Sequence, residues 1–301
     1  MQNRIAVVIV TFNRLTKLKK ALSAYDEQVY KPYEICVVDN NSTDGTREYL
    51  VNWVSDRSAY RRNVINLEKN LGGSGGFFEG IKSIMTRDFD WLWISDDDAY
   101  PEKDALSKMN DCINSLPNNQ VRAICSSVET SEGLDLSHRK IKDDFVLGVS
   151  APIELYSKKE FEISGFSFVG SCIERNALIE CGLPQKDFFI WFDDTEYSLR
   201  VNEKFKMMCV PSIRVFHDTI IEKEWRYSWK TYYGERNKLY TLQKHMPEDE
   251  FKKYLMHYRL GMIKHFFTDH KYYLSQRDGY TDFKKGITGV PEDHKPGKYK
   301  Y

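Results

Sequence analysis

The chain passes three times, within residues 5–85, from a strand-like segment through a polar loop into a helical pattern. The strand-like segments are residues 5–10, 34–38 and 63–67. Short apolar runs of this kind are typical of strands that are buried on both faces of a sheet. Because units of strand, loop and helix repeat in this order, their strands are expected to pair in parallel. The sequence therefore predicts an α/β fold with an open, mostly parallel sheet flanked by helices.

A fourth strand is predicted at residues 91–94, and we expect Pro101 to stop it. Three consecutive carboxylates follow this strand: Asp96, Asp97 and Asp98. The carboxyl ends of parallel strands meet at one edge of the sheet, so the four loops are expected to line one crevice. Adjacent carboxylates repel one another, and a hard divalent cation that also binds a diphosphate would hold them together. The alternative is a solvated acidic turn.

The first two loops carry groups suited to a nucleotide. The loop after the first strand offers donors for a base, a ribose or a phosphate: Thr11, Asn13 and Arg14. Asp39, at the end of the second strand, can accept a hydrogen bond from a base or a ribose hydroxyl. The alternative for residues 39–42 is an ordinary turn, in which Ser42 or Thr43 caps the following helix.

The third loop is rich in glycine over residues 72–76, and a helix is expected from about Gly76 to Met85. Glycines allow close approach of the backbone to a phosphate or a sugar. The spacing matches neither the dinucleotide-binding fingerprint nor the P-loop. A flexible hinge is the alternative interpretation.

Charge is unevenly distributed, although the formal net charge of the 301 residues is zero. Residues 222–301 contain 17 Lys and Arg against 11 Asp and Glu, whereas residues 1–221 contain 27 against 33. An acidic body indicates a metal site rather than nucleic acid, and a basic tail indicates an anionic surface or acceptor.

The six cysteines form no CxxC pair, which favours reduced thiols over a disulfide framework or a zinc site. With no signal peptide and no apolar stretch of roughly 20 residues, we expect a cytoplasmic protein, with peripheral association at the inner face of the cell membrane left open.

Several motifs resemble family 2 glycosyltransferases of the GT-A fold. They are residues 8–14 (VIVTFNR), 37–46 (VVDNNSTDGT) and 95–98 (SDDD). Residues 70–77 (NLGGSGGF) resemble the branch that contains bacterial galactofuranosyltransferases and rhamnosyltransferases. The resemblance implies a Rossmann-like GT-A catalytic domain over residues 1–225 and a helical, basic and aromatic extension over residues 226–301.

The resemblance also implies roles for individual residues. The nucleotide and donor sugar would be bound by Thr11, Phe12, Asn13, Arg14, Asp39, Asn70, Gly72, Gly73, Asp96 and Asp97. Asp98 would bind Mn²⁺ or Mg²⁺ together with His217, which lies in residues 215–218 (VFHD). A structural, partly buried histidine is the alternative for His217.

A second acidic group lies in residues 191–197 (WFDDTEY). The resemblance makes Asp194 the general base and assigns acceptor binding to Trp191, Asp193 and Glu196. The galactofuranosyl relatives place a tryptophan directly before the acidic pair, whereas this chain has Phe192 there. The alternative is the exposed start of a helix, where acidic residues are favourable.

These roles imply an inverting, metal-dependent glycosyltransferase. A cation on Asp98 would stabilise the leaving diphosphate, while Asp194 would take the proton of the attacking hydroxyl. The donor is expected to be UDP-galactofuranose, with another UDP-sugar or dTDP-rhamnose as alternatives. The acceptor would be a glycan or lipid-linked glycan in cell-surface polysaccharide synthesis. The rival hypotheses are a non-catalytic sugar-nucleotide or glycan-binding module on the same fold, and a nucleotidyltransferase.

The tail has two features of its own. Residues 232–240 resemble a segment of the same branch, in which Arg236 and Asn237 would lie near donor phosphates or a neighbouring subunit. Further on, apolar residues recur at helical spacing: Phe251, Tyr254, Leu255, Tyr258, Met262, Phe266 and Phe267. Packing against the catalytic domain and contact with an anionic, lipid-linked acceptor are both open explanations. A homo-oligomer is open as well.

Overall fold

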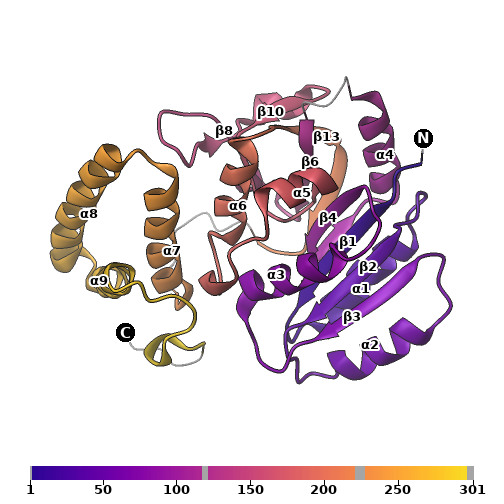
Figure 1. The fold of residues 1–301 in the computed structure, drawn as a ribbon, viewed down its shortest axis with the longest axis horizontal. Helices are drawn as coiled ribbons and strands as arrows, with labels where there is room; N and C mark the ends of the chain where they lie inside the picture. The colour runs from indigo at the N-terminus through magenta and orange to yellow at the C-terminus, as the bar shows by residue number, and fades with distance from the viewer. Residues whose placement is uncertain (1, 117–120, 221–227, 297–301) are drawn as a thin grey trace.

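The computed structural model describes residues 2–116, 121–220 and 228–296 (Figure 1). A ten-stranded sheet forms the body, with its main path in the order β10-β13-β6-β12-β4-β1-β2-β3. Its first half consists of β1 (Ile5–Thr11), β2 (Glu34–Asp39), β3 (Arg61–Asn66) and β4 (Trp91–Asp96). These four strands are parallel, as the repeated units predict. The α/β fold with a mostly parallel sheet is thus confirmed.

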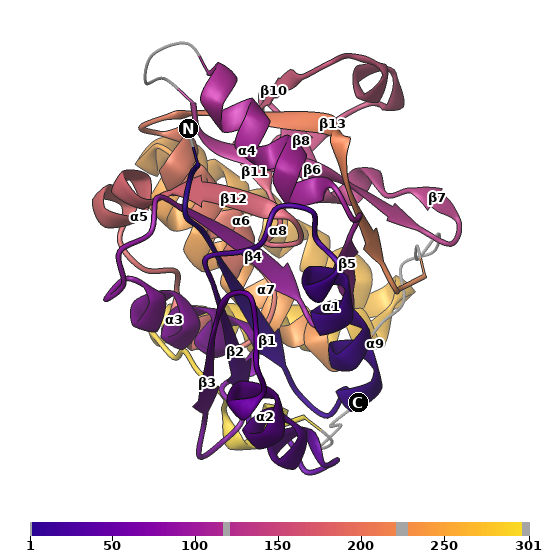
Figure 2. The same ribbon diagram turned by 90° about the vertical axis from the view of Figure 1, so that its right-hand side faces the viewer.

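Helices cover both faces of this sheet (Figures 1 and 2). They are α1 (Leu15–Asp26), α2 (Thr46–Ser55), α3 (Gly72–Ile84), α4 (Ala105–Ser115), α5 (Arg175–Cys181) and α6 (Asp193–Asn202). Alternate residues of β1 enter two separate cores. Ala6 and Val8 pack with α3, whereas Val7 and Ile9 pack with α1 and α4. This two-sided burial explains why β1 and β2 are buried along their whole length.

The second half of the sheet is mixed. It contains β5 (Ala99–Pro101), β6 (Val121–Thr130), β7 (Gly133–Leu134), β10 (Phe161–Ile163), β12 (Ser171–Glu174) and β13 (Lys206–His217). β13 runs parallel to β6 and then pairs with β5, where His217 lies opposite Ala99. A small sheet of β8 (Arg139–Ile141), β9 (Val149–Ser150) and β11 (Gly165–Phe166) lies beside it. The pairing of β13 with β5 brings residue 217 next to the aspartate run.

Two expectations about the ends of elements were wrong. Pro101 does not stop the fourth strand, because β4 already ends at Asp96 and Pro101 belongs to β5. Helix α2 begins at Thr46 with Gly45 at its N-cap, so neither Ser42 nor Thr43 caps it. The side chain of Asp44 accepts the hydrogen bond from the Thr46 amide instead, at 3.2 Å. Gly45 has φ of 90°, a conformation that is cheap for glycine and costly for serine or threonine.

The glycine-rich segment is also not a loop, because α3 starts at Gly72 and includes all of residues 72–76. Close packing explains its composition. A Cβ on Gly76 would lie 2.5 Å from a methyl of Val10, and one on Gly80 would lie 2.6 Å from a methyl of Val8. The glycines therefore let α3 lie directly on β1, and the flexible-hinge interpretation fails with the loop.

We expect Gly72→Ala to lower the free energy of unfolding by at least about 2 kcal/mol, because Gly72 has a positive φ of 73°. An added Cβ would lie 1.9 Å from the carbonyl oxygen of Phe189. Gly73→Ala is the matched control, since a Cβ on Gly73 meets nothing within 4 Å. Urea denaturation of both variants measures the difference, and equal stabilities would contradict the packing explanation.

Three helices follow the sheet: α7 (Lys230–His245), α8 (Glu248–Thr268) and α9 (His270–Lys284). They pack against one another around Leu239, Leu242, Phe251, Tyr258 and Phe283. In Figure 1 they stand on one side of the α/β body. The expected C-terminal helices are therefore present, while the boundary between residues 225 and 226 lies outside the described residues. Among the described helices, none combines the length and apolar character needed to cross a bilayer.

Short 3₁₀ helices complete the described chain. They are η1 (Leu136–His138), η2 (Ile153–Ser157), η3 (Lys186–Phe188) and η4 (Glu292–His294). η3 and the residues after it lie between α3 and α7. The Phe189 carbonyl accepts from the Ser74 amide of α3, and the Phe188 carbonyl accepts from Asn237 of α7. This segment leads directly into the acidic pair at the start of α6.

Candidate active site

The carboxyl ends of the parallel strands bring polar side chains to one edge of the sheet. Thr11 at the end of β1 lies opposite Asp39 of β2, and Val10 of β1 lies opposite Asp96 of β4. The ends of the first, second and fourth strands therefore lie side by side at this edge, as the parallel pairing predicts. Side chains from distant parts of the sequence join them there.

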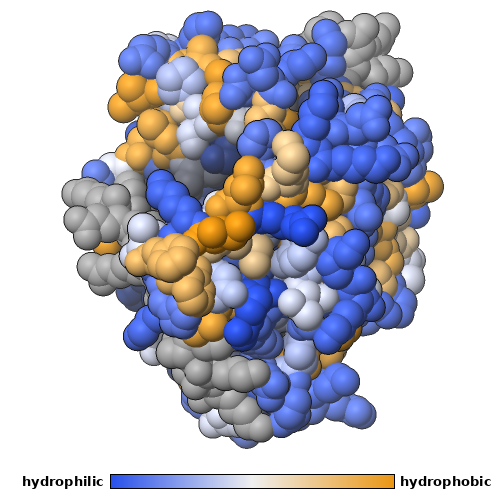
Figure 3. Space-filling view, turned by 90° about the vertical axis from the view of Figure 1, so that its left-hand side faces the viewer, coloured by the Kyte–Doolittle hydropathy of each residue, from blue (hydrophilic) through white to orange (hydrophobic). Residues whose placement is uncertain are grey.

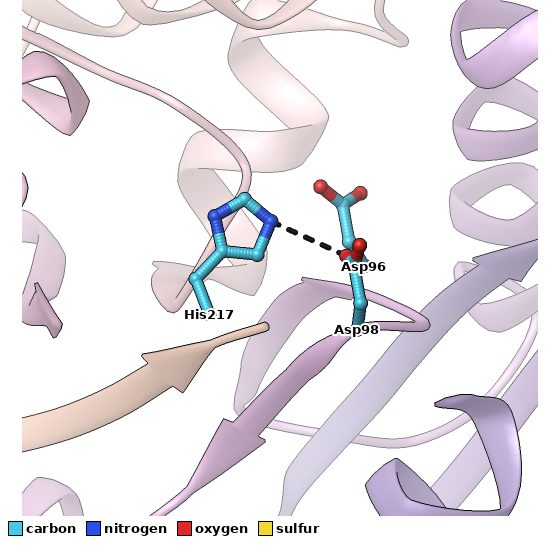
Figure 4. A group of neighbouring side chains, drawn as sticks. All are labelled: Asp96, Asp98 and His217. Carbon is cyan, nitrogen blue, oxygen red and sulfur yellow. Dashed lines mark ion pairs between the residues drawn. The ribbon is translucent and has the colours of Figure 1, made fainter. Parts of the chain in front are cut away.

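Asp96, Asp98 and His217 form a compact group, which we call the acid cluster. Each offers one ligand atom, and these atoms lie within 4.8 Å of one another. The Nε2 atom of His217 is 3.2 Å from Oδ1 of Asp98. Figure 4 shows the imidazole at the end of β13 facing the carboxylates that follow β4. Two carboxylates and an imidazole are ligands that suit Mn²⁺ as well as Mg²⁺.

The electrostatics of the acid cluster depend on burial and on repulsion between carboxylates. Burial and the charge of Asp98 raise the pKa of Asp96 to about 7. Burial opposes ionisation of Asp98, but the hydrogen bond from His217 and the charge of Arg14 lower its pKa to about 2. Burial likewise opposes protonation of His217, yet its hydrogen bond with Asp98 and the charge of Asp96 raise its pKa. Repulsion between the two carboxylates is thus relieved by protonation, and a bound cation would relieve it as well.

The middle aspartate points elsewhere. Asp97 accepts a hydrogen bond from Thr11 Oγ1 at 2.7 Å and is 3.3 Å from Arg14 Nη1. Residues 97 and 98 form the turn between β4 and β5, and this turn leaves Asp98 beside Asp96 while Asp97 contacts Thr11. Asp96, which we expected to bind ribose or sugar, thus lies among the candidate metal ligands. The spacing of two aspartates around one residue was the signal for this grouping.

Two basic side chains of the first loop and α1 neutralise Asp98. Oδ2 of Asp98 lies 2.7 Å from Arg14 and 3.3 Å from Lys17. Arg14 and Lys17 therefore place positive charge beside the acid cluster. Lys17 was missed by the sequence analysis, although it follows Arg14 by three residues, which places both on one side of the helix start.

His138 is a second residue that the sequence analysis missed. Its ring packs edge-on against His217, with ring centroids 5.4 Å apart. Its own nitrogens lie 2.6 Å from Ser167 Oγ and 3.3 Å from Asp135. This contact is made through the rings alone, and Nδ1 of His217 has no hydrogen-bond partner among the described residues. No sequence motif marks His138.

The other expected donor-binding residues shape the loops around this edge. Asp39 is fully buried and accepts from the Ser42 amide at 2.9 Å. Asn13 has φ of 53°, and its side chain accepts from the Thr43 amide at 2.7 Å. The side chain of Phe12, in the same loop as Asn13, is 40% exposed. Asp39 thereby shapes the turn of its own loop, and Asn13 links the first loop to the second.

The start of α3 is held in a similar way. The side chain of Asn70 accepts from the Gly72 amide at 2.7 Å, and Asn40 accepts from the Leu71 amide at 2.7 Å. The amide group of Asn40 donates to the Gly72 carbonyl, also at 2.7 Å. Asn70 and Gly72 thus have clear structural roles. Gly73 differs, because a Cβ added to it would meet no atom within 4 Å.

The acidic pair forms the first turn of α6. Burial and the charges of Asp194 and Asp96 raise the pKa of Asp193 well above its usual range. Burial also raises the pKa of Asp194, against hydrogen bonds from Thr195 that lower it. Oδ1 of Asp194 accepts from the Thr195 amide at 2.6 Å. The alternative interpretation was an exposed helix start. It is wrong in that respect, because the side chain of Asp193 is buried.

The segment before the acidic pair is strained. Phe189, Trp191 and Phe192 have φ of 68°, 65° and 72°, which is unfavourable for side chains of this size. Trp191 remains 41% exposed. Such a conformation persists only where its surroundings hold it, and here α7 holds it.

Asn237 of α7 is the central contact. Its fully buried side chain donates to the carbonyls of Phe188, Ile190 and Trp191 at 2.9, 3.0 and 3.0 Å. Arg236, also fully buried, donates to the carbonyls of Phe188 and Gly289. The expectation that both would lie near donor phosphates or a neighbouring subunit was wrong, because both are buried inside this chain.

We expect Asn237→Asp to lower kcat by at least about tenfold, because a carboxylate repels the three carbonyls and releases the segment that positions the acidic pair. UDP binding, measured by thermal shift, should change little. Thr241→Val is the control, since Thr241 is equally buried on α7 and its hydroxyl has no partner among the described residues. Wild-type kcat in Asn237→Asp would contradict this positioning role.

Glu196 does not have the environment of an acceptor-binding residue. It is fully buried, with Arg200 at 2.9 Å, Lys244 at 2.6 Å and His245 at 3.3 Å. Burial opposes its ionisation, but hydrogen bonds from His245 and Lys244 and the charge of Arg200 lower its pKa to about 2. Glu196 therefore fastens α6 to the end of α7, which corrects the expected acceptor contact.

Comparison with known proteins identifies relatives of this chain. A family model described as "Glycosyl transferase family 2" matches residues 6–180. The galactofuranosyltransferase GlfT1 of Mycolicibacterium smegmatis is 30% identical over 200 residues, which are 65% of this chain and 65% of that protein. The uncharacterized glycosyltransferase RP339 of Rickettsia prowazekii is 26% identical over 219 residues, or 72% and 63% of the two chains. The chain thus matches a little under two thirds of the length of these relatives.

The fold also has solved counterparts. The crystal structure of GalNAc-T7 with UDP, GalNAc and Mn²⁺ superposes with a TM-score of 0.64 at 16% sequence identity. The match covers 94% of this chain and 57% of that chain. At this level of identity the likeness shows the fold alone, which is the GT-A fold.

Proposed function

The chain belongs to glycosyl transferase family 2, and on this premise we propose that it is an inverting, metal-dependent glycosyltransferase. It moves a sugar from a nucleotide-sugar donor to a hydroxyl group of a glycan or lipid-linked glycan. The observation that carries the proposal is the acid cluster, in which ligand atoms of Asp96, Asp98 and His217 gather within 4.8 Å at the edge of the sheet.

In this proposal the acid cluster holds a divalent cation, Mn²⁺ or Mg²⁺. When bound, the cation stabilises the negative charge that develops on the leaving diphosphate. Asp98 and His217 are the proposed ligands, and Asp96 joins them because the structure places it in the same group. Arg14 and Lys17, which lie against Asp98, supply positive charge to the same diphosphate.

The remaining donor contacts follow the edges of β1, β2 and α3. Residues 11–14 and Asp39 surround the nucleoside, with Phe12 as an exposed ring beside it. Asp97 positions Thr11 and Arg14 through its hydrogen bond and ion pair. Gly73 leaves room for the sugar or the diphosphate at the start of α3.

Asp194 is the proposed general base. Its buried carboxylate has a raised pKa, which suits a group that must accept a proton near neutral pH. Attack from this side, opposite the diphosphate, gives one displacement and inversion at the anomeric carbon. Asp193 precedes the base in the first turn of α6, and the exposed Trp191 provides a surface for the acceptor sugar.

The favoured donor is UDP-galactofuranose. The similarity to a protein named galactofuranosyltransferase supports this donor. Another UDP-sugar or dTDP-rhamnose remains the alternative. The acceptor would belong to cell-surface polysaccharide synthesis, with the protein acting in the cytoplasm.

A panel of nucleotide sugars tests the proposal. Each donor is incubated with the protein and Mn²⁺ or EDTA, and release of nucleoside diphosphate is measured beside the thermal shift. We expect UDP-galactofuranose to give release that EDTA abolishes. A thermal shift without release or transfer for any donor and glycan acceptor would favour the non-catalytic binding module instead.

A further inference from the structure

The outer face of α8 carries an exposed apolar stripe. The outer stripe consists of Met256, Leu260, Ile263 and Phe267, whose exposed fractions are 55%, 58%, 60% and 79%. Their spacing of four, three and four residues places them along one side of the helix. Figure 3 shows this side of the molecule, where hydrophobic atoms form a band between hydrophilic areas.

The opposite face of α8 already meets the packing needs of the helix. Phe251 and Tyr258 are buried against α7 and α9, and Tyr254, Leu255 and Met262 pack beside them. The Tyr258 hydroxyl donates to Glu235 of α7 at 2.9 Å. Of the seven residues whose packing was left open above, five therefore face the helical core, while Phe266 and Phe267 are exposed. The outer stripe takes no part in this core. Its exposed apolar surface is therefore available to contact a binding partner.

Basic side chains flank the outer stripe on both sides. Helical geometry places Lys252 and Arg259 along one border, and Lys253 and Lys264 along the other. All four are exposed. The acidic residues of α8 are confined to its first turn, and residues 251–268 contain none. An apolar stripe between two basic borders is the pattern of a helix that lies in an anionic membrane surface.

The same pattern disfavours a second copy of the chain as the partner. If two outer stripes packed against each other, the basic borders of both helices would face one another without acidic residues between them. Like charges held together in this way are destabilising. An anionic surface, by contrast, would neutralise both borders at once.

We propose that the outer face of α8 binds the surface of an anionic lipid bilayer. The outer stripe enters the boundary between headgroups and acyl chains, and the flanking lysines and arginine contact lipid phosphates. The protein would thereby be held where a lipid-linked glycan is presented. Binding of α8 does not depend on the proposed transfer reaction, since it needs neither donor nor cation.

Vesicle flotation of the full-length protein tests this proposal without any sugar nucleotide. One set of vesicles contains phosphatidylcholine alone, and the other contains phosphatidylcholine and phosphatidylglycerol in equal amounts. We expect binding only to the anionic vesicles, weakened by added salt. Ile263→Glu should reduce that binding at least about tenfold, because it places a charge in the stripe and repels the lipid phosphates.

Val51→Glu is the matched control. Val51 lies on α2, away from α8, and both Val51 and Ile263 are 60% exposed, so neither change disturbs a core. The control should float like the wild type.

Equal flotation of wild type and Ile263→Glu, or no preference for anionic lipid, would overturn the proposal. Sedimentation equilibrium tests the alternative partner. If the wild type forms a dimer that Ile263→Glu dissociates, and the wild type does not float with vesicles, a second copy is the partner and the membrane proposal is overturned. Failure of the transferase assay would leave the flotation result untouched.

Discussion

Asp194→Asn is expected to lower kcat by about 10²–10⁴-fold while leaving UDP binding almost unchanged. Asparagine has nearly the same shape as aspartate but cannot accept the proton of the attacking hydroxyl. Its side-chain oxygen still accepts from the Thr195 amide, which Asp194 binds at 2.6 Å, so the first turn of α6 should stay in place. Turnover with the best donor of the panel, together with a UDP thermal shift, measures both effects.

The neighbouring aspartate provides the comparison for this prediction. Asp193 is buried beside Asp194 and within reach of the charge of Asp96. Because burial raises the pKa of Asp193 well above its usual range, Asp193→Asn changes the charge near neutral pH little, and we expect it to lower kcat less than Asp194→Asn does. Retained turnover in Asp194→Asn with lost turnover in Asp193→Asn would move the general base to Asp193.

The pH dependence of kcat adds a readout that misfolding does not mimic. Because burial raises the pKa of Asp194, the wild type should lose activity as the pH falls through that raised value. At lower pH the carboxyl group is protonated and cannot act as a base. The residual activity of Asp194→Asn should lack this acidic limb.

Asp98→Ala is expected to abolish the stabilisation that UDP and Mn²⁺ together give to the wild type. At a ligand concentration about 100-fold above Kd, binding adds about 2.7 kcal/mol, or a rise in Tm of roughly 4 °C for a chain of this size. The variant loses the carboxylate that lies 3.2 Å from His217 and 2.7 Å from Arg14. Differential scanning fluorimetry with UDP, Mn²⁺, both or neither measures the effect.

Asp97→Asn is the matched control for the metal assignment. It changes an adjacent carboxylate that contacts Thr11 and Arg14 and lies outside the acid cluster. We expect it to retain a stabilisation that requires Mn²⁺, although weaker. Each variant is compared with its own ligand-free Tm, because loss of Asp98 also releases Arg14 and Lys17. The same shift in Asp98→Ala as in the wild type would refute the metal site.

Much of the active edge could be predicted from the sequence because it depends on local order. Each strand of the first half ends in a polar loop, and parallel pairing then places these loops together whatever the details of packing. This argument alone places Asp39 and Asp96 at the edge of the sheet, whereas the turn between β4 and β5 brings Asp98 beside Asp96. The resemblance supplied the roles of residues that no periodicity could assign.

Other features depended on packing between distant elements. The glycines of residues 72–76 are suited equally to a flexible loop and to a helix, and only the close approach of α3 to Val10 and Phe189 decides for the helix. Arg236 and Asn237 sit in a polar, aromatic stretch that looks exposed in the sequence. Their burial follows from strained carbonyls of residues 188–191 that need donors.

The sequence by itself determined the order of strands and helices, the family and the acidic groups, because these follow from periodicity and from motifs within a few residues. Tertiary structure alone decided which of these groups meet. His217 joins Asp98, 119 positions away, because β13 crosses beside β6 and ends against β5. Likewise, α7 holds the strained segment before Asp193. Contacts of this kind arise from the pairing of strands and the burial of polar groups across the whole chain, which no local pattern encodes.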